Sequence, residues 1–273
     1  ADVWGLRENK YRCLLDEDLK KTAWTLLEPQ SPFYLFVPRN INRLAEYDNA
    51  YKVTDIFPIN VLGFQTHRDH FAIDFDKVRV NERIIDLRNA SLTDKYLKER
   101  YNLKDNSDWQ MSIVRKQLQG DANWETHLAY CLYRPFDWRW GYLGTPVMDR
   151  PRQELIDNVA WKKNICLLSS RQQAVSGYKH CWVSDAPAND CAISTTSREA
   201  NQVFPLYVYY DEEKAKQKEL FRSIVSRPGK NGRIPNLNPD FVSAFASRLG
   251  LTFVSDGHGD LAATFGPEDV FNY

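Results

Sequence analysis

The sequence lacks an excess of charge of either sign. Among its 273 residues, 36 lysines and arginines balance 36 aspartates and glutamates. A neutral chain has no global attraction to nucleic acid or to anionic lipid, so any basic surface has to be local. The sequence also lacks apolar runs of about 18 residues and a signal-peptide pattern. We therefore expect a cytoplasmic protein with no membrane partner.

Cysteine is scarce, odd in number and never arranged as C-x-x-C. The five cysteines are Cys13, Cys131, Cys166, Cys181 and Cys191. This pattern favours free thiols in a reducing compartment over a disulfide framework or a zinc knuckle.

The motifs of several enzyme classes are missing as well. The sequence contains no G-x-x-x-x-G-K-[ST] phosphate loop, no G-x-G-x-x-G, no H-E-x-x-H and no G-x-S-x-G. It also lacks the Asp/Asn-Pro-Pro-Tyr tetrapeptide of amino-methyltransferases. His67 and His70, in HRDH, could ligate a metal, but two histidines alone do not make a site. We therefore expect no catalytic centre, cofactor or metal in this chain.

Both ends of the sequence have the character of a piece of a larger protein. The first residues, ADVWGLRENKY, have no initiator Met. The last residues, FGPEDVFNY, place Pro267 in the first turn of a helix that is only beginning.

Helical patterns dominate the first half of the sequence. Residues 8–24 place Tyr11, Leu14, Leu15 and Leu19 at helical spacing, and residues 76–118 are mostly helical with a break near YNLKDNSDW. Further helices are expected at 150–159, 211–226 and 239–249.

Local signals mark the ends of two of these helices. Ser107 and Gln110 form a capping-box pattern, and Gly120 is typical of a helix end. The helix at 239–249 is bracketed by an N-cap, a first-turn proline and a terminal glycine, namely Asn238, Pro239 and Gly250.

Short β-favouring runs dominate from His127 onward, and a few precede it. The runs are SPFYLFVPRN, two strands in VLGFQTHRDHFAID with a Gly turn and a polar loop between them, HLAYCLY, NICLLSS, KHCWVSD, CAIST and VFPLYVYY. The predicted architecture is α+β, with a helical N-terminal part and a mostly antiparallel, β-rich second part.

Arginines and aromatic residues alternate in YRPFDWRW, residues 133–140, inside a locally basic stretch. From Tyr133 to His180 the sequence carries eight basic side chains and four acidic ones. Arginine reads guanine and glutamine reads adenine in the DNA major groove, and hydroxyl groups suit phosphates. SSRQQ, at 169–173, offers all three groups directly after an apolar strand, and STTSRE, at 194–199, repeats the arrangement.

A second interpretation of YRPFDWRW needs no DNA. Arg134 and Arg139 would pair with Asp137 and neighbouring acids, and Phe136, Trp138 and Trp140 would be core residues. For the three aromatic residues we expect the core; for the arginines, composition leaves both interpretations open.

Several segments in order resemble the C-terminal part of Type ISP restriction–modification enzymes. They are WGLRENKY, SPFYLFVPRN, DIFPINVLGFQTHRDHFAIDFD, YRPFDWRW, MDRPRQELI, LLSSRQ, VFPLYVYY and NLNPDFVSAFASRLGL…FGPEDVFNY. GFQTHRDHFAID is also similar to the G-x-x-[ST]-G-x-N-x-x-F segment that opens recognition domains in related adenine methyltransferases. His67 and Asp69 stand where that segment has Gly and Asn.

The resemblance implies a division of the chain. Residues 1–45 would follow the methyltransferase core, and residues 46–273 would form the target recognition domain, with sublobes 46–125 and 126–273. The parent protein would be a restriction enzyme with adenine-specific DNA methyltransferase activity. S-adenosylmethionine would bind in the methyltransferase domain, outside this chain. The partners would be double-stranded DNA and the methyltransferase and translocase domains of the same parent chain.

The function expected from the residues and the resemblance is recognition of double-stranded DNA, with the target presented to the methyltransferase domain. The side chains expected to contact DNA are Thr66, Arg68, Arg134, Arg139, Arg150, Arg152, Ser169, Ser170, Arg171, Gln172, Gln173, Lys179, Thr195 and Arg198. The alternative is a structural coupling domain between methyltransferase and translocase that touches DNA little. A stand-alone hydrolase is the third hypothesis.

Overall fold

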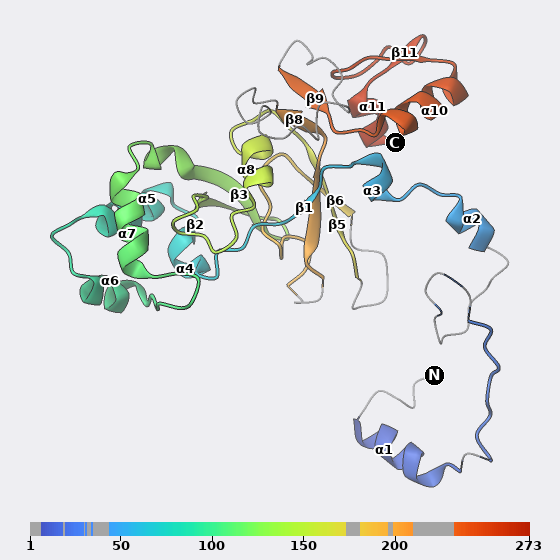
Figure 1. The fold of residues 1–273 in the computed structure, drawn as a ribbon, viewed down its shortest axis with the longest axis horizontal. Coiled ribbons are helices and arrows are strands. Elements are labelled where there is room, and N and C mark those ends of the chain that lie inside the picture. The colour runs from blue at the N-terminus through green and yellow to red at the C-terminus, as the bar shows by residue number, and fades with distance from the viewer. Residues whose placement is uncertain are drawn as a thin grey trace. The chain divides into compact units, whose positions relative to one another are not determined.

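The computed structural model describes residues 7–18, 20–29, 31, 34, 44–172, 181–195, 199–209 and 232–273. The chain divides into two compact units, Ala1–Tyr51 and Lys52–Tyr273. The boundary expected at residue 45 and the two sublobes stay predictions. Figure 1 shows the elements of the second unit, which contains most of the secondary structure.

The first unit contains helices α1 (Arg7–Asp16) and α2 (Leu44–Asp48). The helix expected at 8–24 therefore ends eight residues early, at Asp16. Asp18 explains this, because its side chain accepts a hydrogen bond from the backbone N–H of Lys20 at 3.1 Å and so stabilises a turn in place of helix. No residue of α1 is buried, so no packing counters that turn. Of the strand predicted in SPFYLFVPRN, the structure describes only Ser31 and Tyr34, and neither is assigned to a strand.

The second unit begins with α3 (Val53–Ile56) and continues into a helical lobe, visible at one end of the unit in Figure 1. The lobe contains α4 (Asp69–Ala72), α5 (Lys77–Arg88), α6 (Asp94–Tyr101), α7 (Met111–Gly120) and the 3-10 turn Trp124–His127. Asp76 caps α5 and Thr93 caps α6, each by accepting a hydrogen bond from a backbone N–H of the first turn. The helical pattern predicted for 76–118, with its break, is confirmed.

The capping box predicted at Ser107 and Gln110 is wrong. The first backbone N–H of α7, that of Met111, donates to the carboxylate of Asp105 at 3.0 Å, while Ser107 donates to Asp108. Asp105 reaches this position because the loop folds back, which the sequence spacing does not reveal. The helix end predicted at Gly120 is confirmed.

Two antiparallel sheets form the middle of the unit. The first has the order β2 (Ile73–Asp74), β4 (Asp137–Tyr142), β3 (Leu128–Arg134). The second has the order β1 (Val61–Leu62), β7 (Asn201–Pro205), β5 (Cys166–Ser170), β6 (Cys181–Ser184). Helix α8 (Gln153–Val159) lies between β4 and β5 in the chain and confirms the helix predicted at 150–159. These sheets and the helical lobe confirm the α+β class.

One predicted strand, CAIST, is a turn. The backbone N–H groups of Ala192 and Ile193 donate to the side-chain oxygen of Asn201 at 3.0 and 3.4 Å. An amide from β7 thus takes the hydrogen bonds that a strand neighbour would have made, and the chain bends.

The main hydrophobic core joins the helical lobe to both sheets. Helices α5 and α7 contribute buried residues at helical spacing, namely Val80, Ile84, Leu87, Met111, Val114 and Leu118. The sheets contribute Leu132, Leu168 and Val203, among others. Because one cluster spans these elements, the helical lobe positions the β3–β4 hairpin firmly.

A smaller C-terminal lobe packs on a second cluster formed by Phe57, Phe204, Leu206, Tyr207 and Leu237. Its elements are β8 (Tyr207–Tyr209), β9 (Arg233–Pro235), α10 (Pro239–Leu249), β10 (Thr252–Phe253), β11 (Thr264–Phe265) and α11 (Pro267–Asn272). The predicted caps of α10 and the helix start at Pro267 are confirmed. Gly250 has a φ of 68°, which glycine adopts without strain. The helix predicted at 211–226 lies outside the described residues.

His258 gives this lobe an expected dependence on pH. Its Nδ1 lies 2.7 Å from Asp269 and its Nε2 lies 3.1 Å from Glu268. The hydrogen bond with Asp269 is the main cause that raises the pKa of His258 above its ordinary value. The stabilisation of the folded state by His258 is therefore complete below the unfolded pKa and is lost as the pH rises through the folded one.

We expect His258→Ala to lower Tm at about pH 5.5, with the difference in Tm from the unaltered chain narrowing towards about pH 9. Melting curves across this range test it, and a constant gap would contradict it.

All five cysteines are free thiols, in agreement with their spacing. Within the described part of the chain, no helix has the length and apolar character needed to cross a bilayer.

Candidate nucleic-acid interface

The segment Gly63–Gln65 is clamped between two other parts of the chain. Phe64 bridges in parallel to Asn189, and Gln65 bridges in antiparallel to Arg150. A Cβ on Gly63 would lie 2.5 Å from the backbone of Asn189 and Asp190, so only glycine allows this approach. Gly63 is therefore a close-contact residue and not the turn that the sequence predicted.

The next residues form a tight turn that starts α4. The hydroxyl of Thr66 donates to Asp69 and accepts a hydrogen bond from the backbone N–H of Arg68 at 3.0 Å. His67 has a φ of 54°, in the left-handed region that glycine favours. The backbone thus keeps, at His67, the conformation that the glycine of the similar segment would allow.

Arg68 is an interior residue, only 5% exposed. Its guanidinium lies 2.7 Å from Asp149, donates to the carbonyls of Thr66 and Val147 at 2.9 Å, and sits 4.3 Å from the ring centre of Trp109. Burial by itself would raise the pKa of Asp149, but hydrogen bonds from Arg68 and His67 outweigh it and lower that pKa. Thr66 and Arg68, both expected to touch DNA, are thus engaged inside the protein.

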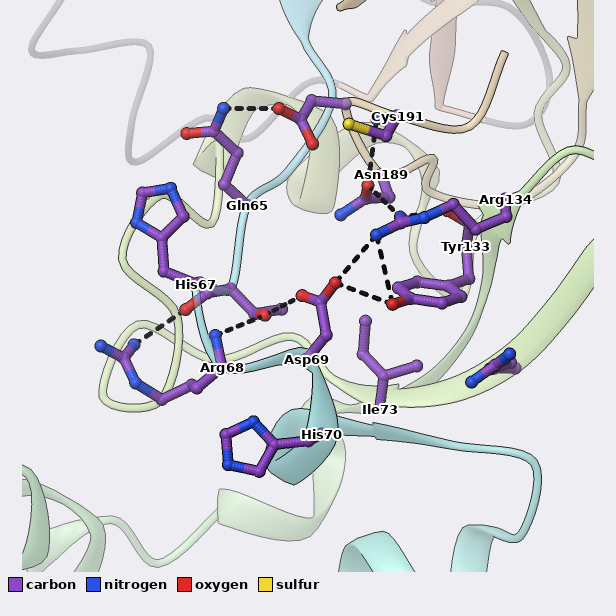
Figure 2. A pocket seen from close by; sticks show the side chains of 13 residues that line it. Gln65, His67, Arg68, Asp69, His70, Ile73, Tyr133, Arg134, Asn189 and Cys191 are labelled. Atoms are coloured by element: carbon purple, nitrogen blue, oxygen red, sulfur yellow. Dashed lines mark hydrogen bonds and ion pairs between the residues drawn. The ribbon is translucent and has the colours of Figure 1, made fainter. Parts of the chain in front are cut away.

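A polar hollow of about 660 Å³ lies beside this turn. Figure 2 shows Asp69 pointing toward Tyr133 and Arg134, which line the hollow with it. Asp69 accepts hydrogen bonds from Tyr133 at 2.8 Å and from Arg134 at 3.0 Å. Arg134 also donates to the side chain of Asn189 at 2.6 Å. Burial, with the hydrogen bond to Asp69 second, raises the pKa of Tyr133 to about 12, so its hydroxyl remains a donor at neutral pH.

The arginines of YRPFDWRW are paired with acids. Arg139 makes a forked contact with Asp137 at 2.7–3.1 Å, and this contact is the main cause that raises the pKa of Arg139. Arg134 is paired with Asp69. The pairing with acids that the second interpretation predicts is therefore observed, with both arginine side chains 26% exposed. Arg134 is therefore not a free cation, because Asp69 offsets its charge.

The aromatic residues of the same segment divide into two kinds. Trp138 and Trp140 are partly buried and pack against the main core, as expected. Phe136 is 85% exposed, so its assignment to the core is wrong. The cause is local: Phe136 lies in the turn of the β3–β4 hairpin, beyond the reach of the core.

The strand predicted in NICLLSS is confirmed as β5, and its end is open to solvent. Ser169 and Ser170 pair with β7 and are half-buried, and Arg171 and Gln172, which follow, are exposed. Among the described residues, no carboxylate forms an ion pair with Arg171. The strand end therefore presents a guanidinium and an amide to an external partner.

The remaining expected contact residues lie in varied places. Arg150 and Thr195 are exposed, and the backbone of Arg150 bridges to that of Gln65, which lines the hollow. Arg152 precedes α8 with a φ of 57°, and its Nε is buried without a hydrogen-bond partner. Gln173, Lys179 and Arg198 lie outside the described residues.

Sequence reasoning missed Asn189 and the role of Asp69. Asn189 joins the strand segment at Phe64 to Arg134 through its two side-chain ends. Its contacts span 125 and 55 residues of sequence, so no local signal could have found it. His67 and His70 have separate partners, Asp149 and the carbonyl of Tyr101. Within the described ranges, no group of three potential ligands could hold a metal ion.

The fold and the site define an α+β domain with a clamped strand, a polar hollow and an open strand end. The family described as the Type ISP C-terminal specificity domain matches residues 55–273, and the chain belongs to this family. The resemblance seen in the sequence is thereby confirmed.

Two solved structures have similar folds. One is a DrdV–DNA complex solved by cryo-EM, with a TM-score of 0.54, 15% identity, and coverage of 89% of this chain and 24% of that one. The other is a nuclease-deletion mutant of the Type ISP restriction–modification enzyme LlaGI with a DNA substrate mimic, with a TM-score of 0.51, 17% identity, and coverage of 90% and 23%. The chain spans about a quarter of the length of each. No protein of curated function matches the chain.

Proposed function

We propose that this chain recognises a short target sequence in double-stranded DNA and presents it to an adenine-N6 methyltransferase domain of its parent protein. The parent would be a cytoplasmic restriction enzyme whose methyltransferase domain binds S-adenosylmethionine and whose translocase domain is a further partner. Membership of a specificity-domain family supports the proposal, and both similar structures are described with DNA.

The observation that carries the proposal is the open end of β5. Arg171 and Gln172 have side chains that can make bidentate contacts with guanine and adenine edges, and both are exposed. Ser169 and Ser170, just before them, have hydroxyls suited to phosphate. Arg150, whose backbone bridges to that of Gln65, adds an exposed cation. Phosphate contacts would supply much of the affinity and make it dependent on salt.

The coupling-domain alternative has one observation in its favour. The charges of Arg134 and Arg139, the two arginines of YRPFDWRW, are offset by Asp69 and Asp137. A coupling domain would show weak DNA binding with little dependence on salt. Titrating DNA affinity against salt concentration therefore separates the two functions, since a recognition domain loses affinity steeply as salt increases.

Replacing Arg171 with alanine is expected to weaken binding to the preferred sequence by about 1–3 kcal/mol and to relax preference at one base pair. The side chain is exposed, so Tm should remain close to that of the unaltered chain. Selection from a random duplex library, followed by affinity and melting measurements, tests this.

Two further variants serve as comparisons for Arg171→Ala. Arg150→Ala should weaken binding to all sequences alike and lower the salt slope by about one, as loss of a phosphate contact does. Arg248→Ala, an exposed arginine at the end of α10, should change neither quantity. An Arg171→Ala variant with lowered Tm and unaltered preference would remove Arg171 from the interface.

A further inference from the structure

The β3–β4 hairpin turns in a way that its sequence does not favour. Arg134 pairs with Asp137, which leaves Pro135 and Phe136 as the turn. Phe136 has a φ of 60°. Proline at the second position and a positive φ at the third are the pattern of a type II turn, whose third position prefers glycine or asparagine. A bulky residue there is strained.

The contacts of the Phe136 ring add little stability to the folded state to offset that strain. It is 85% exposed, and it contacts the ring of Trp182, at 4.5 Å between centroids. Glycine in its place would relieve the backbone, and a polar residue would remove the exposed apolar surface. The stability of the fold therefore does not explain a phenylalanine at this position.

Sheet register places this ring against the sheet that carries the open strand end. Trp182 on β6 is the Cα partner of Leu168 on β5, and Ser169 is the partner of Cys181. Arg171 and Gln172 follow within four residues of Leu168. The tip of one sheet's hairpin thus contacts the other sheet at β6, opposite the middle of β5, with the polar end of β5 about 10 Å further along the strand at about 3.3 Å per residue.

We propose that the ring of Phe136 stacks on a nucleobase of DNA held at the open end of β5. This inference rests on the proposed function and adds a stacking residue to it. Aromatic side chains stack on bases of any sequence, and apolar side chains can enter between the base pairs of a duplex. Trp182 contacts the ring, and the polar end of β5, with Ser170, Arg171 and Gln172, follows Leu168, the strand partner of Trp182.

A nucleobase fits this setting better than an apolar protein surface does. A protein interface needs a continuous apolar centre with a polar rim. Here the neighbouring strand end is polar and cationic, which suits a base with its attached phosphates. Burial of Phe136 against another protein domain is the competing outcome in the test.

Phe136→Gly separates a role in DNA binding from a role in fold stability. The replacement removes the ring and also relieves the backbone strain. We expect Tm to stay close to that of the unaltered chain, while affinity for duplex DNA decreases about 5- to 150-fold, equivalent to about 1–3 kcal/mol. The loss should be similar for all sequences, unlike that of Arg171→Ala. Phe136→Tyr keeps the ring and should retain affinity.

Leu261→Gly is the matched control. Leu261 also has a positive φ, 58°, and is 65% exposed, but it lies in the C-terminal lobe. Its replacement should relieve the same kind of strain without changing DNA affinity. All affinities are measured by fluorescence anisotropy with a labelled random-sequence duplex, at a temperature where every variant is folded.

The outcomes are distinct. Unchanged affinity of Phe136→Gly, or equal losses in Phe136→Gly and Phe136→Tyr, overturns the stacking role and leaves the proposed function standing. Absence of DNA binding by the unaltered chain overturns the proposed function and the stacking role together. Loss with Gly and retention with Tyr, beside an unaffected Leu261→Gly, is the result that the proposal requires.

Discussion

Replacing Asp149 with alanine is expected to lower the free energy of unfolding by about 3–5 kcal/mol. Asp149 and Arg68 form an ion pair in which the side chains are 7% and 5% exposed. Removing the carboxylate leaves a guanidinium buried beneath Trp109 without its counter-charge. The desolvation of that charge is then no longer offset. A unit of this size should melt about 6–20 °C lower.

The pH dependence of the same variant has a defined sign. Because the pKa of Asp149 is lowered in the folded protein, its contribution is present above the unfolded pKa of about 3.9 and is lost as the pH falls through the folded one. Denaturant titrations at several pH values measure this.

Lys98→Ala is the control. It breaks the pair with Asp105, whose side chains are 33% and 42% exposed, and should lower the free energy of unfolding by at most about 1 kcal/mol. Equal losses for the two variants would show that Arg68 is not buried as described.

Arg233→Met should be comparably severe in the C-terminal lobe, at about 3–5 kcal/mol. Arg233 is 4% exposed, contacts Asp256 at 2.5–2.9 Å and donates to the carbonyl of Lys163 at 2.9 Å. Its guanidinium lies 3.7 Å from the ring centre of Tyr207. Methionine keeps much of the volume and removes the charge, so the carboxylate of Asp256 loses this partner.

Denaturant titration and limited proteolysis together measure the effect of Arg233→Met. We expect earlier cleavage within residues 232–273, because β9 and the loop of Asp256 are joined by this side chain. Arg248→Met, the same replacement at an exposed arginine of α10, is the control and should stay within about 0.5 kcal/mol of the unaltered chain. If the two variants are equally stable, the network around Arg233 does not stabilise the lobe.

The sequence by itself determined the features that depend on neighbours in the chain. The α10 caps, Asn238 and Gly250, were predicted because each acts within a few residues of its own position. The apolar strand of NICLLSS and its polar end were predicted for the same reason, because alternation and composition are local. The order of the segments also sufficed to suggest the family to which the chain belongs.

Tertiary structure alone decided which polar groups are used internally. Arg68 and Arg171 have the same side chain, yet one is buried against Asp149 and the other is exposed at a strand end. Arg134 meets Asp69 across 65 residues, a pairing that no spacing rule predicts. Phe136 lies outside the core because it is in the turn between β3 and β4, and the position of that turn depends on how the two strands pair. Charge pairing and burial depend on distances in space, and the fold sets those distances only after the local elements have packed.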